Sequence, residues 1–234
     1  MAGVLELDPR ALERLVVAAL GRAPTAILPM PGGASTRRYL RVATDAGTAV
    51  AMFVPDAAPE EATSPSSPGT TRWPFLEVRA LLDARGIRVP RLLGEACADG
   101  LILLEDLADE TLSTFLGRFP DRRAEVYRQA VRDLARAQSA LAELPERSIV
   151  SSRVFDEGLL RWELDHFREW GLDARGRTLS PVARAAFDGI ADRLARRIAA
   201  WPRGFVHRDY QSTNLMVVEN PFELCWLEIG RAHV

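Results

Sequence analysis

Apolar residues in the first part of the chain follow two different periods. Residues 8–22 and 73–85 carry their apolar side chains at helical spacing, which predicts an amphipathic helix in each segment. Residues 39–43 alternate between apolar and polar side chains, and residues 48–54 form an apolar run. Together with the glycine-containing segment 30–35, these patterns predict short antiparallel strands joined by a turn.

Farther along the chain, patterns typical of strands give way to patterns typical of helices. Residues 89–96 and 101–105 are predicted as strands, and the second is so apolar that we expect it in the interior of a sheet. Long amphipathic patterns then occupy residues 121–144, 155–170 and 181–201. The chain therefore changes from mainly strands to mainly helices.

This order predicts an α+β protein with two lobes. We expect a small β-rich N-terminal lobe over residues 1–105 and a helical C-terminal lobe over residues 106–227, with residues 105–108 as the connection. Residues 55–71 are rich in Pro, Ser, Thr and Glu and have little to bury, so a mobile surface loop is expected there.

Composition narrows the class of protein. With 234 residues, 47% hydrophobic and 26% charged, the chain can form a globular core, which excludes disordered and collagen-like classes. A net charge of −2 argues against a nucleic-acid partner. Because no apolar run has membrane-spanning length and no signal-peptide pattern occurs, we expect a cytoplasmic protein without a membrane partner. The chain contains no lysine, which excludes mechanisms that need one.

One string carries recognisable chemistry. His207-Arg208-Asp209 is followed by Asn214, which matches the pattern H-R-D-x-x-x-x-N of phosphoryl-transfer catalytic loops. Such a loop needs a carboxylate that orients the acceptor hydroxyl and takes its proton, and an amide oxygen that helps to hold magnesium. The alternative is an ordinary surface turn. Short strands are predicted on either side of the loop, at residues 204–206 and 215–218.

With this motif the chain resembles the aminoglycoside phosphotransferase and choline kinase superfamily of kinase-like small-molecule phosphotransferases. Segments 33–42, 50–52, 103–107 and 207–214 are most similar to the bacterial cell-wall amino-sugar kinases within it. The resemblance implies a bilobal kinase-like fold with ATP and Mg²⁺ as cofactors. It also implies a sugar substrate, with transfer of the γ-phosphoryl group to the anomeric hydroxyl of N-acetylmuramate or N-acetylglucosamine in peptidoglycan recycling.

The resemblance assigns roles by position. Asp209 matches the catalytic base and Asn214 the magnesium-binding residue, while His207 and Arg208 would brace the loop. The helix over residues 155–170 would help to line the acceptor pocket. Its aromatic residues stand at helical spacing, which favours packing in the core or between helices over stacking on a sugar ring. These residues are Trp162, Phe167 and Trp170.

The nucleotide side is assigned in the same way. Glu105 and Leu107 match the hinge, whose backbone would hydrogen-bond the adenine edge; a buried strand that simply ends in acidic residues is the alternative. The phosphate-covering loop matches a short turn, although a two-glycine hairpin without a ligand would look the same. That turn consists of Gly32, Gly33, Ala34, Ser35 and Thr36.

One feature departs from the kinase pattern at the phosphates. Met52 stands where a phosphate-binding lysine is expected, so the positive charge must come from arginine, which can hold phosphate bidentately. The candidates are Arg37, Arg38 and Arg41, and the alternative is that they are solvated strand residues. Glu77 could orient that cation, but an exposed helix position is favoured.

The end of the chain is the larger departure. A second metal carboxylate, in a string such as I-D-F or I-D-W, is expected near residues 226–228 and is absent. Residues 228–234 also match the in-frame translation of a common sequencing adapter. We therefore expect them to be a non-native tail, the natural chain to continue beyond Leu227, and the 234-residue chain by itself to be inactive.

Other functions stay open at this point. A nucleotide-binding pseudokinase or inactive kinase fragment would explain the missing lysine and the missing second carboxylate. A kinase for aminoglycosides, choline-like alcohols or other sugars would share the same catalytic loop. A protein kinase is less favoured because no A-P-E string or activation loop is evident.

Overall fold

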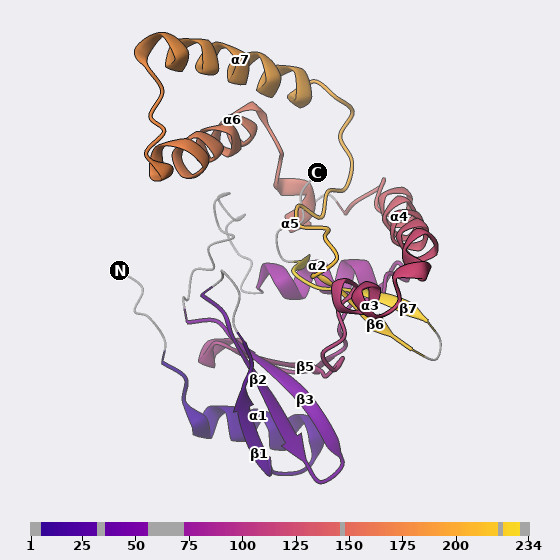
Figure 1. Cartoon of the computed structure of the whole chain (residues 1–234). Coiled ribbons are helices and arrows are strands. Elements are labelled where there is room, and N and C mark those ends of the chain that lie inside the picture. The colour runs from indigo at the N-terminus through magenta and orange to yellow at the C-terminus, as the bar shows by residue number, and fades with distance from the viewer. Residues whose placement is uncertain (1–5, 32–35, 56–72, 146–147, 220–221, 230–234) are drawn as a thin grey trace.

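The structure of the chain is a computed structural model that describes residues 6–31, 36–55, 73–145, 148–219 and 222–229 (Figure 1). Most of the segment expected to be a mobile loop, residues 56–71, lies outside these ranges. Gly32, Gly33, Ala34 and Ser35 of the expected phosphate loop also lie outside them.

A five-stranded antiparallel sheet forms the first part of the molecule, with strand order β1-β2-β3-β5-β4. The predicted interior position of β5 is confirmed, and its first four residues are buried. Strand β4 begins later than predicted, since Pro90 has no N–H for a ladder. Strand β1 was not predicted because it is short and mostly exposed. The strands are β1 (Ala26–Pro29), β2 (Arg38–Thr44), β3 (Gly47–Phe53), β4 (Leu92–Ala96) and β5 (Leu101–Glu105).

Helix α1 (Pro9–Leu20) covers one face of this sheet and packs on β4 and β5 (Figure 1). Its first turn is capped by Asp8, whose carboxylate accepts a hydrogen bond from the Arg10 N–H at 2.9 Å. Gly21 ends it in the left-handed region at φ 70°. The predicted amphipathic helix is thus confirmed, and its apolar side forms a core with the sheet.

The other face of the sheet packs against helices and a small β-hairpin. Their buried side chains form one continuous core from Met52 in the sheet to Trp226 in the hairpin. The core therefore includes residues on both sides of residue 105, where the first lobe was expected to end. Helix α3 was not predicted because it is only 7 residues long. These elements are α2 (Pro74–Asp83), α3 (Leu112–Arg118), α4 (Arg123–Ala140), α5 (Ile149–Ser152), β6 (Leu215–Val218) and β7 (Glu223–Trp226).

The strand predicted over residues 204–206 is wrong. Only Phe205 is buried there, while its two neighbours are exposed. The carbonyl of Phe205 accepts a hydrogen bond from the Gln138 side chain at 3.2 Å, and Val206 forms only an isolated bridge instead of a strand. The strand predicted after the motif is β6, which pairs with β7.

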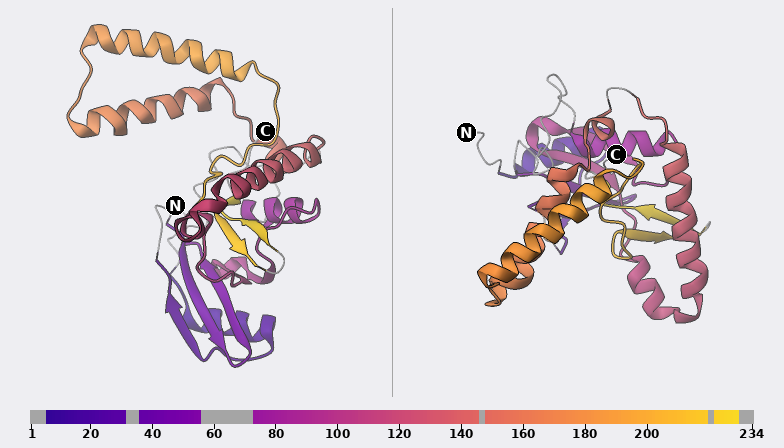
Figure 2. Two further views of the ribbon diagram at one scale, coloured as in Figure 1. Left: turned by 45° about the vertical axis from the view of Figure 1, so that its right-hand side comes forward. Right: turned by 90° about the horizontal axis from the view of Figure 1, so that it is seen from above.

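Helices α6 (Glu157–His166) and α7 (Pro181–Ala199) form a hairpin that extends away from the sheet (Figure 2). A π-helix, η3 (Phe167–Leu172), continues α6. The prediction that Trp162, Phe167 and Trp170 pack inside the protein is wrong, because they are 49%, 59% and 66% exposed. Charged side chains hold these two helices together instead. Nowhere in the described ranges is a helix both long and apolar enough to cross a membrane.

Candidate active site

Asp209 and Asn214 face each other across a tight loop. The Asn214 Nδ2 donates to the Asp209 carboxylate at 2.7 Å and to the Asp209 carbonyl at 3.0 Å. Backbone bonds from Gln211 N–H to the Asp209 carbonyl and from Asn214 N–H to the Gln211 carbonyl close the turn between them. Because Nδ2 is used in this way, the amide oxygen of Asn214 is left for a ligand.

His207 connects this loop to the backbone after β7. Its Nδ1 accepts a hydrogen bond from the Asp209 N–H at 3.3 Å, so its Nε2 carries the proton and donates to the Leu227 carbonyl at 3.0 Å. Burial lowers the pKa of His207, which favours the neutral ring that this pair of bonds requires. The ring also meets Tyr210 and Trp226 edge to face.

Arg208 points to the opposite side of the loop. Its backbone is in the left-handed region, at φ 70°. Its guanidinium pairs with Glu163 of α6 at 2.5 Å and lies 5.3 Å from the centre of the Phe155 ring. His207 and Arg208 therefore contact different parts of the fold from one short segment.

A cavity of about 220 Å³ lies between the sheet and the start of the helical region. Its walls are mostly apolar and end at Asn214, as a cleft for a flat ring with a polar tail requires. Three residues expected at the nucleotide, Met52, Glu105 and Leu107, line it. Thr36 is an exposed residue two positions before β2 and does not line it.

The hinge offers a backbone edge to this cavity. In the described part of the chain, the N–H of Leu107 makes no hydrogen bond, so it can donate to a ring nitrogen. The turn is held by Asp106, which accepts from the Ala108 N–H at 2.9 Å while Ala108 is left-handed at φ 60°. Arg41 of β2 pairs with Asp106 at 2.7 Å and with Asp109 at 2.8 Å.

The side chain of Glu105 has a structural role. Its carboxylate accepts hydrogen bonds from the Arg88 side chain and from the N–H of Arg91 at 2.7 Å. Burial alone would raise the pKa of Glu105, but these hydrogen bonds outweigh it and lower the pKa. The contribution to stability is therefore present above the ordinary pKa of 4.5 and is lost as pH falls through the lower folded value.

Replacing Glu105 by Gln is expected to lower the free energy of unfolding by about 1–3 kcal/mol, because the Arg88 guanidinium loses its charged partner. The loss should shrink as pH falls below 4.5, because the unfolded chain then takes up a proton at this carboxyl while the folded protein, with its lower pKa, still keeps the charge. Urea unfolding at pH 7 and pH 4 measures both. Glu13→Gln, on the exposed face of α1, should change neither value, and equal effects of the two variants would contradict the assignment.

The three candidate arginines have different environments. Arg38 is exposed and stacks on the Phe53 ring at 4.8 Å, and Arg41 pairs with the hinge. Arg37 is buried, and its Nη1 lies 3.1 Å from the carboxylate of Glu228. Among them, Arg37 is the one bonded to Glu228, which lines the cavity together with Asn214.

Glu228 brings a carboxylate to this cavity beside Asn214. Its oxygens accept hydrogen bonds from Arg37 and from the Tyr39 hydroxyl, each at 3.1 Å. Burial, together with the charge of Glu228, raises the pKa of Tyr39 to about 12, so the hydroxyl stays a donor. Because Glu228 is the first residue of the segment expected to be non-native, these contacts give it no role in the proposed site.

Glu77 makes a structural contact between two helices. Its carboxylate accepts a hydrogen bond from the N–H of Ile149, at the start of α5. It therefore joins α2 to α5 and is only partly exposed, which differs from the exposed position that the helical pattern favours.

A second cavity, of about 440 Å³, opens on the other side of the catalytic loop. Phe155, Glu163, Val206, Arg208 and Asp209 line it. The carboxylate of Asp209 thus faces one cavity and its partner Asn214 lines the other. Sequence reasoning placed the α6 segment near an acceptor but did not single out Glu163 or Phe155, since their partner Arg208 lies 45 residues after Glu163.

Comparison with known proteins finds similar sequences of one named activity. The chain is 33% identical over 223 residues to an N-acetylmuramate/N-acetylglucosamine kinase of Pseudomonas aeruginosa, with 92% of this chain and 59% of that protein covered. It is 28% identical over 189 residues to the protein of that name in Neisseria meningitidis, with 79% and 51% covered. The chain thus spans about half to three fifths of the length of the curated relatives it matches.

Solved structures share the fold. The GDP complex of an aminoglycoside 2'-phosphotransferase matches 97% of this chain and 73% of its own, with a TM-score of 0.61 and 14% identity. The ternary complex of streptomycin and ATP with another aminoglycoside phosphotransferase matches 98% and 73%, with a TM-score of 0.58 and 12% identity. The predicted kinase-like α+β fold is confirmed. The profile of the phosphotransferase enzyme family matches residues 26–223, and the chain belongs to this family.

Proposed function

We propose that the protein containing this chain is a kinase that transfers the γ-phosphoryl group of ATP to the anomeric hydroxyl of N-acetylmuramate or N-acetylglucosamine. The observation that carries the reaction class is the hydrogen-bonded pair of Asp209 and Asn214 between two cavities. The names of the curated relatives support the acceptor.

The apolar cavity would take the nucleotide. Met52 and Leu104 line its walls and would contact the faces of adenine, while the free N–H of Leu107 would donate to the adenine edge. The phosphates would then extend toward Asn214 and the buried guanidinium of Arg37. An arginine from β2 would thereby replace the lysine that position 52 lacks.

The residues at the end of this cavity fit Mg²⁺. The amide oxygen of Asn214, which lines the cavity, is a hard oxygen donor of the kind that this ion prefers. In the described segments no three His, Cys, Asp or Glu side chains group into a metal site by themselves, so phosphate oxygens and water would complete the set, as is usual for Mg²⁺. When bound, the ion neutralises charge on the phosphates.

Asp209 would act on the acceptor. A sugar hydroxyl in the second cavity would donate its hydrogen bond to the carboxylate, which orients the oxygen and takes the proton as the bond to phosphorus forms. His207 holds the backbone N–H of Asp209, and Asn214 holds its carboxylate. The side chain therefore meets the acceptor in one orientation.

A coupled ADP-release assay on the full-length protein that contains this chain tests the proposal. We expect turnover with ATP, Mg²⁺ and N-acetylmuramate or N-acetylglucosamine, and a sugar 1-phosphate identified by phosphorus NMR. Kanamycin and choline serve as acceptor controls. Turnover with a control acceptor alone, or a product phosphorylated away from the anomeric oxygen, would overturn the acceptor assignment.

Met52 favours a second candidate, a nucleotide-binding pseudokinase, because the usual phosphate-binding lysine is missing. That function requires a thermal shift with ATP that does not depend on Mg²⁺, and no ADP release with any acceptor. A shift that requires Mg²⁺, together with turnover of an amino sugar, would exclude it.

A further inference from the structure

Helix α6 faces the catalytic loop across the second cavity through one charged contact, from Glu163 to Arg208. We propose that Glu163 is a positioning residue for phosphoryl transfer. Its ion pair with Arg208 holds the loop in the conformation that directs Asp209 toward the acceptor. This inference rests on the proposed kinase function.

The backbone at Arg208 needs such support. Its φ of 70° belongs to the left-handed region, which costs a residue with a side chain roughly 1–2 kcal/mol. A residue keeps this conformation where its surroundings determine it. Because Asp209 is the next residue, a return of Arg208 to an ordinary conformation would turn the Asp209 carboxylate away from its present direction.

One residue of α6, Glu163, and one residue just before this helix, Phe155, hold the Arg208 side chain. Glu163 accepts from its Nη2 at 2.5 Å, and the guanidinium lies over the Phe155 ring at 5.3 Å. The side chain of Arg208 is 16% exposed and that of Glu163 is 41% exposed. The contact is thus a charge-assisted bond with one well-shielded partner, which is stronger than a pair fully in water.

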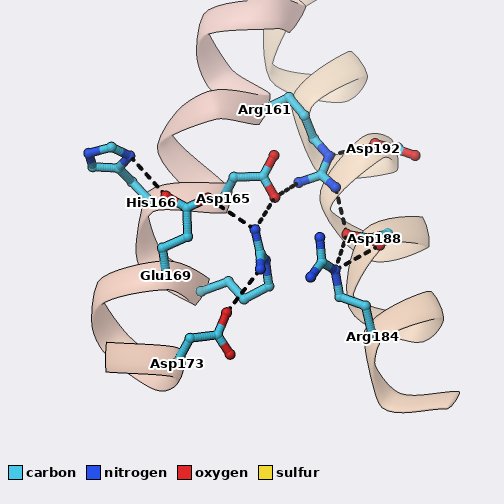
Figure 3. A network of polar contacts seen from close by, with 9 residues as sticks. Arg161, Asp165, His166, Glu169, Asp173, Arg184, Asp188 and Asp192 are labelled. Carbon is cyan, nitrogen blue, oxygen red and sulfur yellow. Dashed lines mark hydrogen bonds and ion pairs between the residues drawn. The ribbon is translucent and has the colours of Figure 1, made fainter. Parts of the chain in front are cut away.

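Helix α6 is itself anchored. Arg161, on the same helix as Glu163, bonds to Asp188 and Asp192 of α7, each at 2.7 Å (Figure 3). Arg168 is buried and pairs with Asp173 at 3.0 Å. The Arg161 contacts fix α6 against α7, and the Arg168–Asp173 pair holds the segment that follows α6, so Glu163 presents its carboxylate from an anchored helix. The α6–α7 pair therefore supports the catalytic loop from outside.

Because different residues line the two cavities, we can predict which kinetic constant changes when the ion pair is lost. Glu163 and Arg208 line the cavity of Asp209, whereas the nucleotide cavity is lined by other residues. Loss of the ion pair should lower kcat, since Asp209 is misdirected, and leave the KM for ATP nearly unchanged.

Glu163→Gln in the full-length protein, compared with Glu157→Gln, tests this role. Glu157 lies on the same helix and pairs with Arg196 at 3.4 Å, with both side chains exposed. We expect Glu163→Gln to lower kcat about tenfold with either amino sugar, with the KM for ATP within about twofold, and Glu157→Gln to leave both unchanged. In an Arg208→Gln background, Glu163→Gln should have no further effect; additive effects would overturn the pairing.

Hydrogen–deuterium exchange separates this inference from the proposed function. Peptides covering residues 207–214 should exchange faster in Glu163→Gln than in wild type or Glu157→Gln, whatever the acceptor. Faster exchange in a protein that phosphorylates neither sugar would support the contact and count against the proposed function. Unchanged exchange, or an unchanged kcat in an active enzyme, would overturn the inference.

Discussion

Replacing Asp209 by Asn is expected to lower kcat by about 10²–10⁴-fold, because the proton of the acceptor hydroxyl loses its acceptor. The amide keeps the shape of the side chain, and its oxygen can still accept the hydrogen bond from Asn214. The loop should therefore keep its conformation, and the melting temperature should stay within a few degrees of wild type. Steady-state kinetics with N-acetylglucosamine and a thermal melt measure both effects.

Asp45→Asn is the matched control. It also removes one negative charge, but Asp45 lies in the turn between β2 and β3 and pairs with Arg22 on the surface. Its kcat should equal that of wild type. If Asp209→Asn retained more than a tenth of wild-type turnover, Asp209 would not be the base, and the proposed mechanism would fail.

The spacing of apolar residues within short segments was enough to predict most of the sheet and helix α1. Alternation in β2 and the buried run of β5 reflect which side chains meet the core, and that information is present in short segments. The predicted ends of the strands were less exact, because the residues at an end depend on contacts with residues elsewhere in the chain. Strand β4 begins after Pro90, and the carbonyl of Phe205 accepts a hydrogen bond from the side chain of Gln138.

The aromatic residues of the α6 segment show where periodicity misleads. Trp162 and Trp170 have helical spacing, yet they are exposed. The side of α6 that meets α7 carries Arg161 instead, whose carboxylate partners Asp188 and Asp192 lie on α7. Hydrophobicity alone does not say which helix face finds a partner, since ion pairs can take that place.

The catalytic loop of the candidate site could be predicted from the sequence, but the residues that contact this loop and the cavities could not. The string from His207 to Asn214 is contiguous, so spacing alone reveals it. The choice among three arginines required the fold, because Arg37 meets Glu228 across 191 residues of chain. The same holds for Glu77, whose partner Ile149 lies in another helix.

Replacing Trp226 by Ala is expected to lower the free energy of unfolding by about 3–5 kcal/mol. The side chain is 1% exposed and is the largest among the fully buried ones in the described residues. Its ring meets Tyr210 at 4.8 Å and His207 at 5.5 Å, both edge to face. The substitution leaves a cavity beneath the catalytic loop, so kcat should also fall, because His207 loses one wall of its pocket.

Because the loss of stability should depend on how buried the tryptophan is, Trp201→Ala is the matched control. Trp201 is 59% exposed, and Trp201→Ala should change the free energy of unfolding by less than about 0.5 kcal/mol. Trp226→Phe should recover most of the lost stability, since a ring still fills much of the space. Urea unfolding of the three variants measures the differences. Equal losses for Trp226→Ala and Trp201→Ala would contradict the packing of Trp226 under the loop, and with it the link between the core and the catalytic residues.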